Sequence, residues 1–343
     1  METTLPNTIE MINRDAENLS VPISCVIELT TKCNWKCKHC YLPDHTSYGL
    51  TFGELEPILQ NFREMGVHKI IFTGGEIFTR RDTLDILAYS RKLGFDVSIL
   101  SNASYITNEI AEKLHKIHIS SFALTIFSLN AEIHDGITKV AGSLKKALRG
   151  AEHLSQNGVR VWVKSPVLKD NMDDIVDVKK YCDKKGYKYT SSACIFPKTN
   201  GDTEPVGYSM DLHDLKEHIS FIDSTNDFEY RSVSDQYMCR YLLRSFAVTY
   251  KGDVTPCNSM FLSVGNLREN TIKEIWNSPE YKEIRELKNR DLEYCSNCEI
   301  VQFCDQCPGT KISEGKLVYS CSSISKNIAL ARHIVYDGGE IDE

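Results

Sequence analysis

The sequence predicts an α/β fold, in which an open, partial barrel of six βα units is followed by a small cysteine-rich α+β domain. Short β-type runs alternate with amphipathic helical patterns from residue 25 to about residue 197. This alternation is typical of a parallel sheet with helical crossovers. Six units are too few to close an eight-stranded TIM barrel, so a partial (β/α)6 TIM-like barrel is expected. Beyond about residue 225 the composition changes, and most of the cysteines appear there.

The elements of the barrel follow one another in a regular order. The predicted strands are CVIEL (25–29), KIIFTG (69–74), VSILSN (97–102), SFALTIFS (121–128), VRVWVKS (159–165) and YKYTSSACIF (187–196). The predicted helices span 51–65, 81–93, 107–117, 143–157 and 173–185. Gly66, Gly94, Gly158 and Gly186 each lie just past one of these helices. A left-handed C-cap favours glycine at that position, so these four residues support the predicted helix ends.

The C-terminal part has a less regular pattern. The turn-rich stretch 196–210 is interpreted as a boundary or an active-site loop. A helix near 211–224, short strands around Tyr250 and a helix near 271–288 are expected to follow, and the acidic end DGGEIDE is expected to be a solvated tail. We therefore divide the chain into an N-terminal extension (1–24), a barrel core (25–225) and a cysteine-rich domain (226–343).

Composition excludes several classes of protein. The 343 residues are 41% hydrophobic and 25% charged, which is ordinary for a globular protein. The net charge of −7 gives no indication of a nucleic-acid-binding surface. No apolar run approaches ~20 residues, so no membrane span is expected. The N-terminus has no secretory signal pattern. A cytoplasmic protein that binds neither nucleic acid nor membrane is therefore expected.

The thirteen cysteines are many for a protein of a reducing compartment, where structural disulfides are disfavoured. Ten of them cluster along the chain, namely Cys33, Cys37, Cys40, Cys239, Cys257, Cys295, Cys298, Cys304, Cys307 and Cys321. Clustered thiols in a reduced protein are typical of metal ligands. Cys25, Cys182 and Cys194 stand apart and fit buried apolar thiols better.

The first cluster has the spacing C-x3-C-x2-C and directly follows the first predicted strand. Its loop therefore lies at the C-terminal end of the sheet, where α/β barrels carry their chemistry. A structural zinc ion would need a fourth ligand, and His39 is too close to Cys40 to serve easily. Three thiolates on a four-iron cluster would instead leave one iron open for a further ligand.

This motif, after the first strand of a βα partial barrel, resembles the radical S-adenosylmethionine (SAM) enzymes. The resemblance implies that SAM chelates the open iron through its amino and carboxylate groups. It also implies that one electron from the cluster cleaves SAM into methionine and a 5′-deoxyadenosyl radical, which takes a hydrogen atom from the substrate.

Further residues carry the resemblance along residues 25 to about 197. Thr73-Gly74-Gly75-Glu76 is similar to the family's GGE motif, in which glycines allow close backbone approach and the carboxylate accepts a hydrogen bond from the SAM ammonium. Ser101-Asn102 is similar to the family's T-N-G sequence, with Ala103 in place of glycine. The remaining SAM-contact candidates implied are His39, Tyr41, Ser128, Lys139 and Lys164. Lys139 stands where arginine is usual, and lysine pairs a carboxylate without bidentate geometry.

The C-terminal cysteines resemble the SPASM domain, which carries auxiliary iron–sulfur clusters. Cys239 and Cys257 have the spacing C-x17-C, with Gly252 five residues before the second cysteine. The pattern C-x2-C-x5-C-x2-C (295–307) follows, and then Cys321. The gap between Cys304 and Cys307 is one residue shorter than in the family. The resemblance implies that Cys295, Cys298, Cys304 and Cys321 hold one four-iron cluster completely. Cys239, Cys257 and Cys307 would hold another, with an open iron or with Asp235 as fourth ligand. Three clusters are expected in all, while the C-x2-C pairs alone would also fit a zinc ribbon.

Cys194 lies near the end of the sixth predicted strand, whose C-terminal side should face the radical. Some peptide epimerases of the family return a hydrogen atom from a cysteine thiol. The resemblance therefore makes Cys194 the candidate catalytic residue, with a buried apolar thiol as the alternative.

SPASM-bearing relatives mostly modify peptides, so the resemblance implies a maturase that crosslinks, epimerises or excises residues of a ribosomally synthesised precursor peptide. The alternatives are a small-molecule dehydrogenase or oxidative decarboxylase, and an anaerobic sulfatase-maturating enzyme. An electron donor such as ferredoxin or flavodoxin is implied. Only about 24 residues precede the first strand, so a separate leader-peptide recognition protein is expected.

Overall fold

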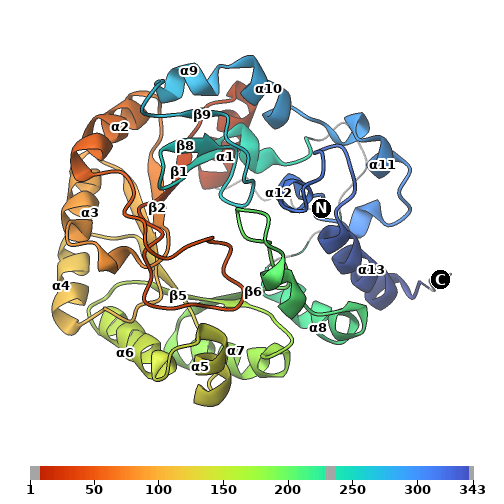
Figure 1. Cartoon of the computed structure of the whole chain (residues 1–343), viewed down its shortest axis with the longest axis horizontal. Coiled ribbons are helices and arrows are strands. Elements are labelled where there is room, and N and C mark those ends of the chain that lie inside the picture. Colours follow the sequence, from red (N-terminus) through yellow and green to blue (C-terminus); the bar gives the residue numbers. More distant parts are fainter. Residues whose placement is uncertain (1–7, 227, 229, 231–236, 340–343) are drawn as a thin grey trace.

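A nine-stranded sheet organises the molecule. The computed structural model describes residues 8–226, 228, 230 and 237–339. The strand order is β6-β5-β4-β3-β2-β1-β7-β8-β9. Neighbouring strands from β6 to β7 run parallel, and β8 and β9 are antiparallel additions. The sheet curves around the centre of the molecule with α2, α3, α4 and α6 outside it (Figure 1). The predicted open (β/α)6 barrel is therefore confirmed.

The strands are β1 (Ser24–Glu28), β2 (Lys69–Thr73), β3 (Asp96–Leu100), β4 (Ser121–Thr125), β5 (Val161–Pro166), β6 (Lys188–Ser192), β7 (Ser245–Val248), β8 (Asp253–Thr255) and β9 (Gly265–Asn266). The crossover helices are α2 (Phe52–Glu64), α3 (Thr83–Lys92), α4 (Asn108–Lys116), α6 (Ser143–Gln156) and α7 (Ile175–Lys185). The four glycines predicted to follow these helices all have positive φ, as a left-handed cap requires.

The core lies between the sheet and the crossover helices. In β2, Ile70 and Phe72 are fully buried in this core, and Val161 and Val163 occupy the same face of β5. Because side chains alternate along a strand, Lys164 faces the opposite side, the interior of the barrel. The outer face of the sheet is thus apolar, and its inner face carries polar side chains.

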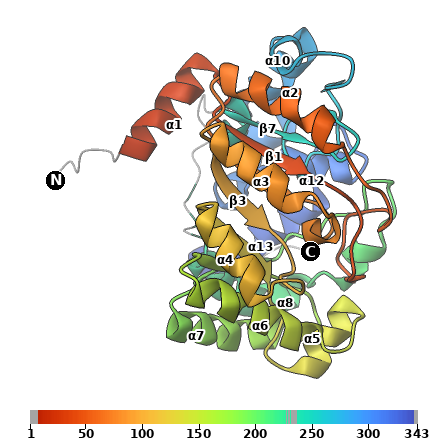
Figure 2. The same cartoon turned by 90° about the vertical axis from the view of Figure 1, so that its left-hand side faces the viewer.

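Several elements differ from those predicted. The segment 271–288 forms two helices, α9 (Ile272–Trp276) and α10 (Pro279–Arg285), because Ser278 caps the second and Pro279 occupies its first turn. The N-terminal extension contains α1 (Thr8–Leu19), which projects from the side of the molecule (Figure 2). The helices α5 (Ala131–Thr138) and α13 (Ser323–Asp337) were also not predicted. The expected tail therefore begins as helix, and its last four residues lie outside the described part.

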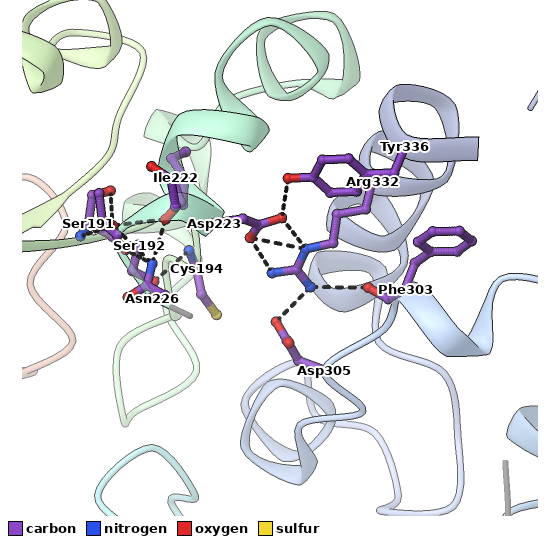
Figure 3. A network of polar contacts seen from close by, with 12 residues as sticks. Ser191, Ser192, Cys194, Ile222, Asp223, Asn226, Phe303, Asp305, Arg332 and Tyr336 are labelled. Atoms are coloured by element: carbon purple, nitrogen blue, oxygen red, sulfur yellow. Dashed lines mark hydrogen bonds and ion pairs between the residues drawn. The ribbon is translucent and has the colours of Figure 1, made fainter. Parts of the chain in front are cut away.

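The open side of the barrel is covered by α8 (Leu212–Ser224) and α13. Thr225 and Asn226, at the end of α8, bond the edge strand β6 at Ser191, where the Thr225 hydroxyl accepts from the backbone N–H at 3.0 Å. Arg332 of α13 makes a buried ion pair with Asp223 of α8 at 2.8 Å (Figure 3). These contacts join the C-terminal part to the barrel. None of the helices in the described residues is long and apolar enough to span a membrane.

Candidate active site and auxiliary thiol groups

Cys33, Cys37 and Cys40, here called the loop triad, lie on the loop after β1, at the C-terminal end of the parallel strands. The backbone N–H groups of Lys36 and Lys38 donate to the last carbonyls of α5, each at 3.0 Å. Helix C-termini leave such carbonyls without intrahelical partners. The unpredicted helix α5 therefore fixes the path of the loop.

The thiols of the loop triad converge. Burial raises the pKa of Cys33 to about 12, and the negative charges of Glu76 and Cys40 contribute. Burial raises the pKa of Cys37 well above its usual range, and the charges of Cys40 and Cys33 add to the effect. Only thiolates bind metals, so a metal centre at this place must displace the thiol protons. Three converging, proton-bearing thiols in a part-buried loop fit an iron–sulfur cluster with one open position.

Gly74 and Gly75 allow the turn after β2 to pack on the backbone that leads into the loop triad. A Cβ at Gly74 would lie 2.3 Å from the Thr30 carbonyl oxygen, and one at Gly75 would lie 2.4 Å from that of Thr31. Gly74 also has φ of +139°, which only glycine adopts readily. The close approach seen here is thus between two backbone segments.

Glu76 is fully buried in the same turn, and its carboxylate accepts hydrogen bonds from its own chain. The donors are the Ser101 hydroxyl at 2.8 Å, the Asn102 N–H at 2.8 Å and the Phe78 N–H at 2.9 Å. Burial raises the pKa of this carboxyl, and these hydrogen bonds oppose the rise. Glu76 therefore joins the ends of β2 and β3, and its contact with the SAM ammonium stays a prediction.

Asn102 connects that turn to the cysteine loop. Its Nδ2 donates to the Asn34 side-chain oxygen at 2.9 Å and lies 3.9 Å from the Cys33 sulfur. The next residue, Ala103, has φ of +59° and is buried against Gly150. This left-handed conformation explains why glycine suits the position in the resembling T-N-G motif.

His39 and Tyr41 flank Cys40 and are both partly buried. Burial lowers the pKa of His39 to about 4, its ring lies edge-on to Phe127 at 5.1 Å, and its Nδ1 has no hydrogen-bond partner in the described residues. The Tyr41 hydroxyl donates to Glu28 at 2.6 Å. The orphaned nitrogen of His39 leaves it able to contact a bound cofactor, whereas the hydroxyl of Tyr41 is already engaged.

The other SAM-contact candidates are Ser128, which follows β4, Lys139, which is the C-cap residue of α5, and Lys164, which lies within β5. The Ser128 hydroxyl accepts from the Asn130 N–H at 2.8 Å, and Lys139 lies 3.9 Å from Glu204 on the surface. The Lys164 ammonium stands 5.1 Å from the centre of the Trp162 ring, and burial followed by the charge of Lys69 lowers its pKa. Their roles toward SAM stay predictions.

Two residues of the segment 133–143 support the structure locally. The His134 Nδ1 accepts from the Phe127 N–H at 3.2 Å. The Asp135 carboxylate accepts from the N–H groups of Gly142 and Leu144 at the start of α6. Both residues therefore position α5, whose end holds the loop triad.

Cys239, Cys257 and Cys307, here called the three-thiol group, come together although they are far apart in sequence. Burial raises the pKa of Cys257 to about 12, with the charges of Cys307 and Cys239 contributing. Gly309 is the structural reason for the approach, because a Cβ there would lie 2.5 Å from the Ser259 carbonyl oxygen. Asp235, the suggested fourth ligand, lies outside the described residues.

Cys295, Cys298, Cys304 and Cys321, here called the four-thiol group, form a second assembly. Burial raises the pKa of Cys304 to about 12, and the charges of Asp305, Cys295 and Cys321 contribute. The buried ammonium of Lys311 lies 3.9 Å from the Cys295 sulfur. The structure thus lets members of each set influence one another electrostatically, and the division into two ligand sets stays a prediction.

The spacing within these groups bears on the zinc alternative. Among the described residues, no three His, Cys, Asp or Glu side chains approach closely enough to hold a single metal ion. In a four-iron cluster each thiolate binds a different iron, so the ligands stand further apart than around one zinc ion.

A cavity of about 710 Å³ lies between the end of β6 and the C-terminal part. Cys194 lines it together with Cys239, Asp305 and Arg332. Arg332 binds Asp305 at 3.2 Å and donates to the Phe303 carbonyl at 3.1 Å, so it holds the segment between Cys304 and Cys307 (Figure 3). The structure thus places the predicted Cys194 beside the three-thiol group.

Sequence reasoning missed the residues that hold these loops. Arg80 is buried and donates to the carbonyls of Leu29 and Leu50, each at 2.8 Å, beside the cysteine loop. Arg332 and Asp223 are separated by 109 residues, and no local pattern marks such a pair. Gly309 follows Cys307 in a C-P-G sequence, which is a turn signal that could have been used.

These features define an enzyme that uses iron–sulfur and SAM chemistry on a partial barrel. Residues 27–182 match the family described as the Radical SAM superfamily, and residues 239–299 match SPASM, described as an iron–sulfur cluster-binding domain. Together the two matches cover well over half of the chain. The chain belongs to the radical SAM superfamily and carries a SPASM domain, so SAM and iron–sulfur clusters are its cofactors.

The curated relatives include heme synthases and a protein of bacteriocin biosynthesis. The AdoMet-dependent heme synthase of Oleidesulfovibrio alaskensis is 26% identical, with 82% of this chain and 81% of the relative covered. The antilisterial bacteriocin subtilosin biosynthesis protein AlbA of Bacillus subtilis is also 26% identical, with 84% of this chain and 67% of the relative covered.

Solved structures share the fold. SuiB of Streptococcus suis, bound to its precursor peptide SuiA, has a TM-score of 0.70 at 20% identity, with 95% of this chain and 83% of that chain covered. The enzyme anSMEcpe, with bound AdoMet and a peptide, has a TM-score of 0.67 at 20% identity, with 91% and 96% covered. Both likenesses confirm the fold of the chain.

Proposed function

We propose that this enzyme modifies a residue of a ribosomally synthesised precursor peptide by radical SAM chemistry. The observation that carries the proposal is the 710 Å³ cavity between the barrel and the three-thiol group. Its lining combines aromatic side chains, such as Tyr237 and Tyr241, with charged ones, such as Arg240 and Asp305. Such a mixed lining suits a peptide segment, which presents apolar side chains and a polar backbone together.

Similarity to peptide-modifying proteins supports the proposal. AlbA is similar over most of this chain, and the sporulation killing factor maturation protein SkfB of Bacillus subtilis is 24% identical over 74% of it. SuiB shares the fold while holding a precursor peptide. A separate leader-recognition protein and a ferredoxin or flavodoxin as electron donor are part of the same proposal.

The cofactors have defined places in this proposal. A four-iron cluster on the loop triad, with SAM on its open iron, would supply the radical that abstracts hydrogen. The residues of this chain orient that assembly, because Glu76, Asn102 and the end of α5 fix the loop. Burial of the triad keeps water away from the reacting groups.

A second candidate is oxidative decarboxylation of a tetrapyrrole. The heme synthase relatives from Oleidesulfovibrio alaskensis, Nitratidesulfovibrio vulgaris and Methanosarcina barkeri, which are 23–26% identical over 82% of this chain, favour it. Arg240 also lines the cavity, but its guanidinium is already paired with Glu17 at 2.6 Å, so this candidate is supported by the relatives rather than by a free cation in the cavity.

Mass spectrometry of the product distinguishes these functions. The anaerobically reconstituted enzyme is incubated with SAM, a reductant and either the short peptide encoded beside its gene or an iron-bound tetrapyrrole with propionates. Loss of two hydrogens from the peptide indicates a crosslink or oxidation. An unchanged mass with deuterium uptake in D2O indicates epimerisation, and a large loss indicates excision. Loss of carbon dioxide together with two hydrogens from a propionate of the tetrapyrrole, with an unmodified peptide, would refute the peptide proposal.

A further inference from the structure

The three-thiol group has one thiol fewer than a four-iron cluster needs for complete thiolate ligation. A four-iron cluster takes four thiolates when no other ligand occupies an iron. Cys239, Cys257 and Cys307 supply three, whereas the neighbouring four-thiol group is complete. The missing ligand decides whether this auxiliary cluster is closed or open to an outside ligand.

Only the cysteines outside the loop triad and the two auxiliary groups could supply a fourth thiolate. Cys25 and Cys182 are fully buried in the core between the sheet and the crossover helices. Cys194 is partly exposed and lines the cavity that Cys239 also lines. It is therefore the one remaining thiol, of the thirteen in the chain, that faces the three-thiol group.

The position of Cys194 suits a ligand. It follows β6, and its backbone N–H donates to the Ser192 hydroxyl at 3.2 Å, which fixes the turn. Figure 3 shows its sulfur pointing away from the contacts between Ser191 and Asn226. Cys194 and Cys239 line the same cavity, so the Cys194 thiol opens toward a member of the three-thiol group.

Asp305 is the competing candidate in the same cavity. Its carboxylate binds Arg332 at 3.2 Å, and Arg332 is itself held by Asp223 at 2.8 Å. If Asp305 bound iron instead, its ion pair with Arg332 would be lost, and the buried pair of Arg332 and Asp223 would lose this contact. Cys194 makes no such ion pair, and thiolate is the ligand that iron–sulfur clusters prefer.

We propose that Cys194 is the fourth ligand of this auxiliary cluster, so that Cys194, Cys239, Cys257 and Cys307 together hold four irons. Ligation forms one iron–thiolate bond and releases the thiol proton to solvent. A closed cluster has no iron free for a substrate thiolate, so it would serve electron transfer alone. The inference goes beyond the proposed function, because it holds for a peptide and for a tetrapyrrole alike.

The test is EPR spectroscopy of the full chain, reconstituted and reduced under anaerobic conditions. A Cys33→Ala/Cys37→Ala/Cys40→Ala background removes the first cluster and leaves the auxiliary signals. In this background Cys194→Ala should change the g values and midpoint potential of one auxiliary cluster, or lower the iron content by about four atoms per chain. Cys182→Ala, a buried thiol of α7, is the matched control and should change neither quantity.

Two further measurements make the outcome decisive. Added 2-mercaptoethanol should leave the Cys194-containing protein unchanged but alter the signal of Cys194→Ala by occupying the vacated iron. Cys194→Ser should retain the cluster with a more negative potential, because an alkoxide is a harder ligand than a thiolate. If Cys194→Ala keeps iron content, g values and potential, the proposal is overturned. Loss of turnover with intact SAM cleavage and unchanged spectra would then assign Cys194 the hydrogen-donor role.

Discussion

Glu76 is the residue on which the geometry of the turn after β2 depends. Its carboxylate accepts from the Asn102 N–H, the Phe78 N–H and the Ser101 hydroxyl. In Glu76→Gln, an amide NH2 must face one of these N–H donors, which leaves a buried donor without a partner. We expect a loss of about 1–3 kcal/mol in the free energy of unfolding and weaker SAM binding.

Anaerobic chemical denaturation and SAM titration measure these effects. Glu112→Gln is the matched control, because Glu112 is exposed and pairs only with Lys116 on the surface of α4. That change should leave the stability nearly unchanged, because water screens an exposed ion pair. Equal stability of the two variants would show that the Glu76 hydrogen bonds do not fix the turn.

His134 links the fold to pH. Burial lowers its pKa from 6.5 to about 4, so the folded state holds the ring neutral while the unfolded state binds a proton below pH 6.5. The stability that His134 provides is present above pH 6.5 and is lost as the pH falls toward 4, by up to about 3 kcal/mol. His134→Gln, which retains an acceptor for the Phe127 N–H, should flatten this dependence. The free energy of unfolding of the unchanged protein and of His134→Gln is measured at pH 7, 6, 5 and 4. Parallel pH dependences for the two proteins would contradict the prediction.

At the scale of elements, the turn after β2 is an example of packing that only glycine permits. In Gly75→Ala the new Cβ would lie 2.4 Å from the Thr31 carbonyl oxygen and 2.5 Å from that of Lys32. Both atoms are backbone that leads directly into Cys33, so the loop triad must shift. We expect lower iron content after reconstitution and loss of SAM cleavage.

Gly53 provides the control for this element. A Cβ at Gly53, in the first turn of α2, meets nothing within 4 Å. Gly53→Ala should therefore keep full iron content and gain up to about 1 kcal/mol in stability. Iron analysis and thermal unfolding compare the two variants. Normal iron content and SAM cleavage in Gly75→Ala would mean that the turn does not set the loop.

The elements also show what the sequence predicts reliably. Six strands and five crossover helices follow from hydrophobic periodicity and end glycines, because one face of each element is buried in a single core. The helix α5 was not predicted, because it has only eight residues and contains Gly136, a residue of low helix propensity. The helix α13 has Ser322 as its N-cap and Gly338 just past its end. Both are sequence signals of helix ends that could have been used to predict it.

At the scale of the whole molecule, the sequence predicts most of the residues of the candidate site but not how they come together in space. The ten clustered cysteines and the GGE turn are local motifs, so the sequence displays them. The cavity that Cys194 shares with Cys239, and the packing of Gly309 on the segment that follows Cys257, depend on how β6, β8 and α12 (Pro308–Ser313) meet in space. No sequence period encodes such long-range contacts.

The pair Asp223–Arg332 is the strongest test of how the two parts of the molecule depend on each other. Its side chains are only 5% and 8% exposed, and Arg332 also holds the carbonyl of Phe303 and the carboxylate of Asp305. Arg332→Met would leave Asp223 as a buried, uncompensated charge, which costs about 3–5 kcal/mol. It would also release the segment between Cys304 and Cys307.

We therefore expect Arg332→Met to lower the unfolding temperature and to lose auxiliary-cluster iron faster under chelation, while the loop triad retains its iron. Asp223→Asn combined with Arg332→Met removes both charges and should recover part of the lost stability. Lys179→Met, which removes an exposed ion pair with Asp183, is the surface control and should cost less than about 0.5 kcal/mol. Anaerobic thermal unfolding and timed iron release measure these effects. If Arg332→Met matched the surface control in both, the ion pair would not join the SPASM part to the barrel, and the α8–α13 contact would depend on apolar packing alone.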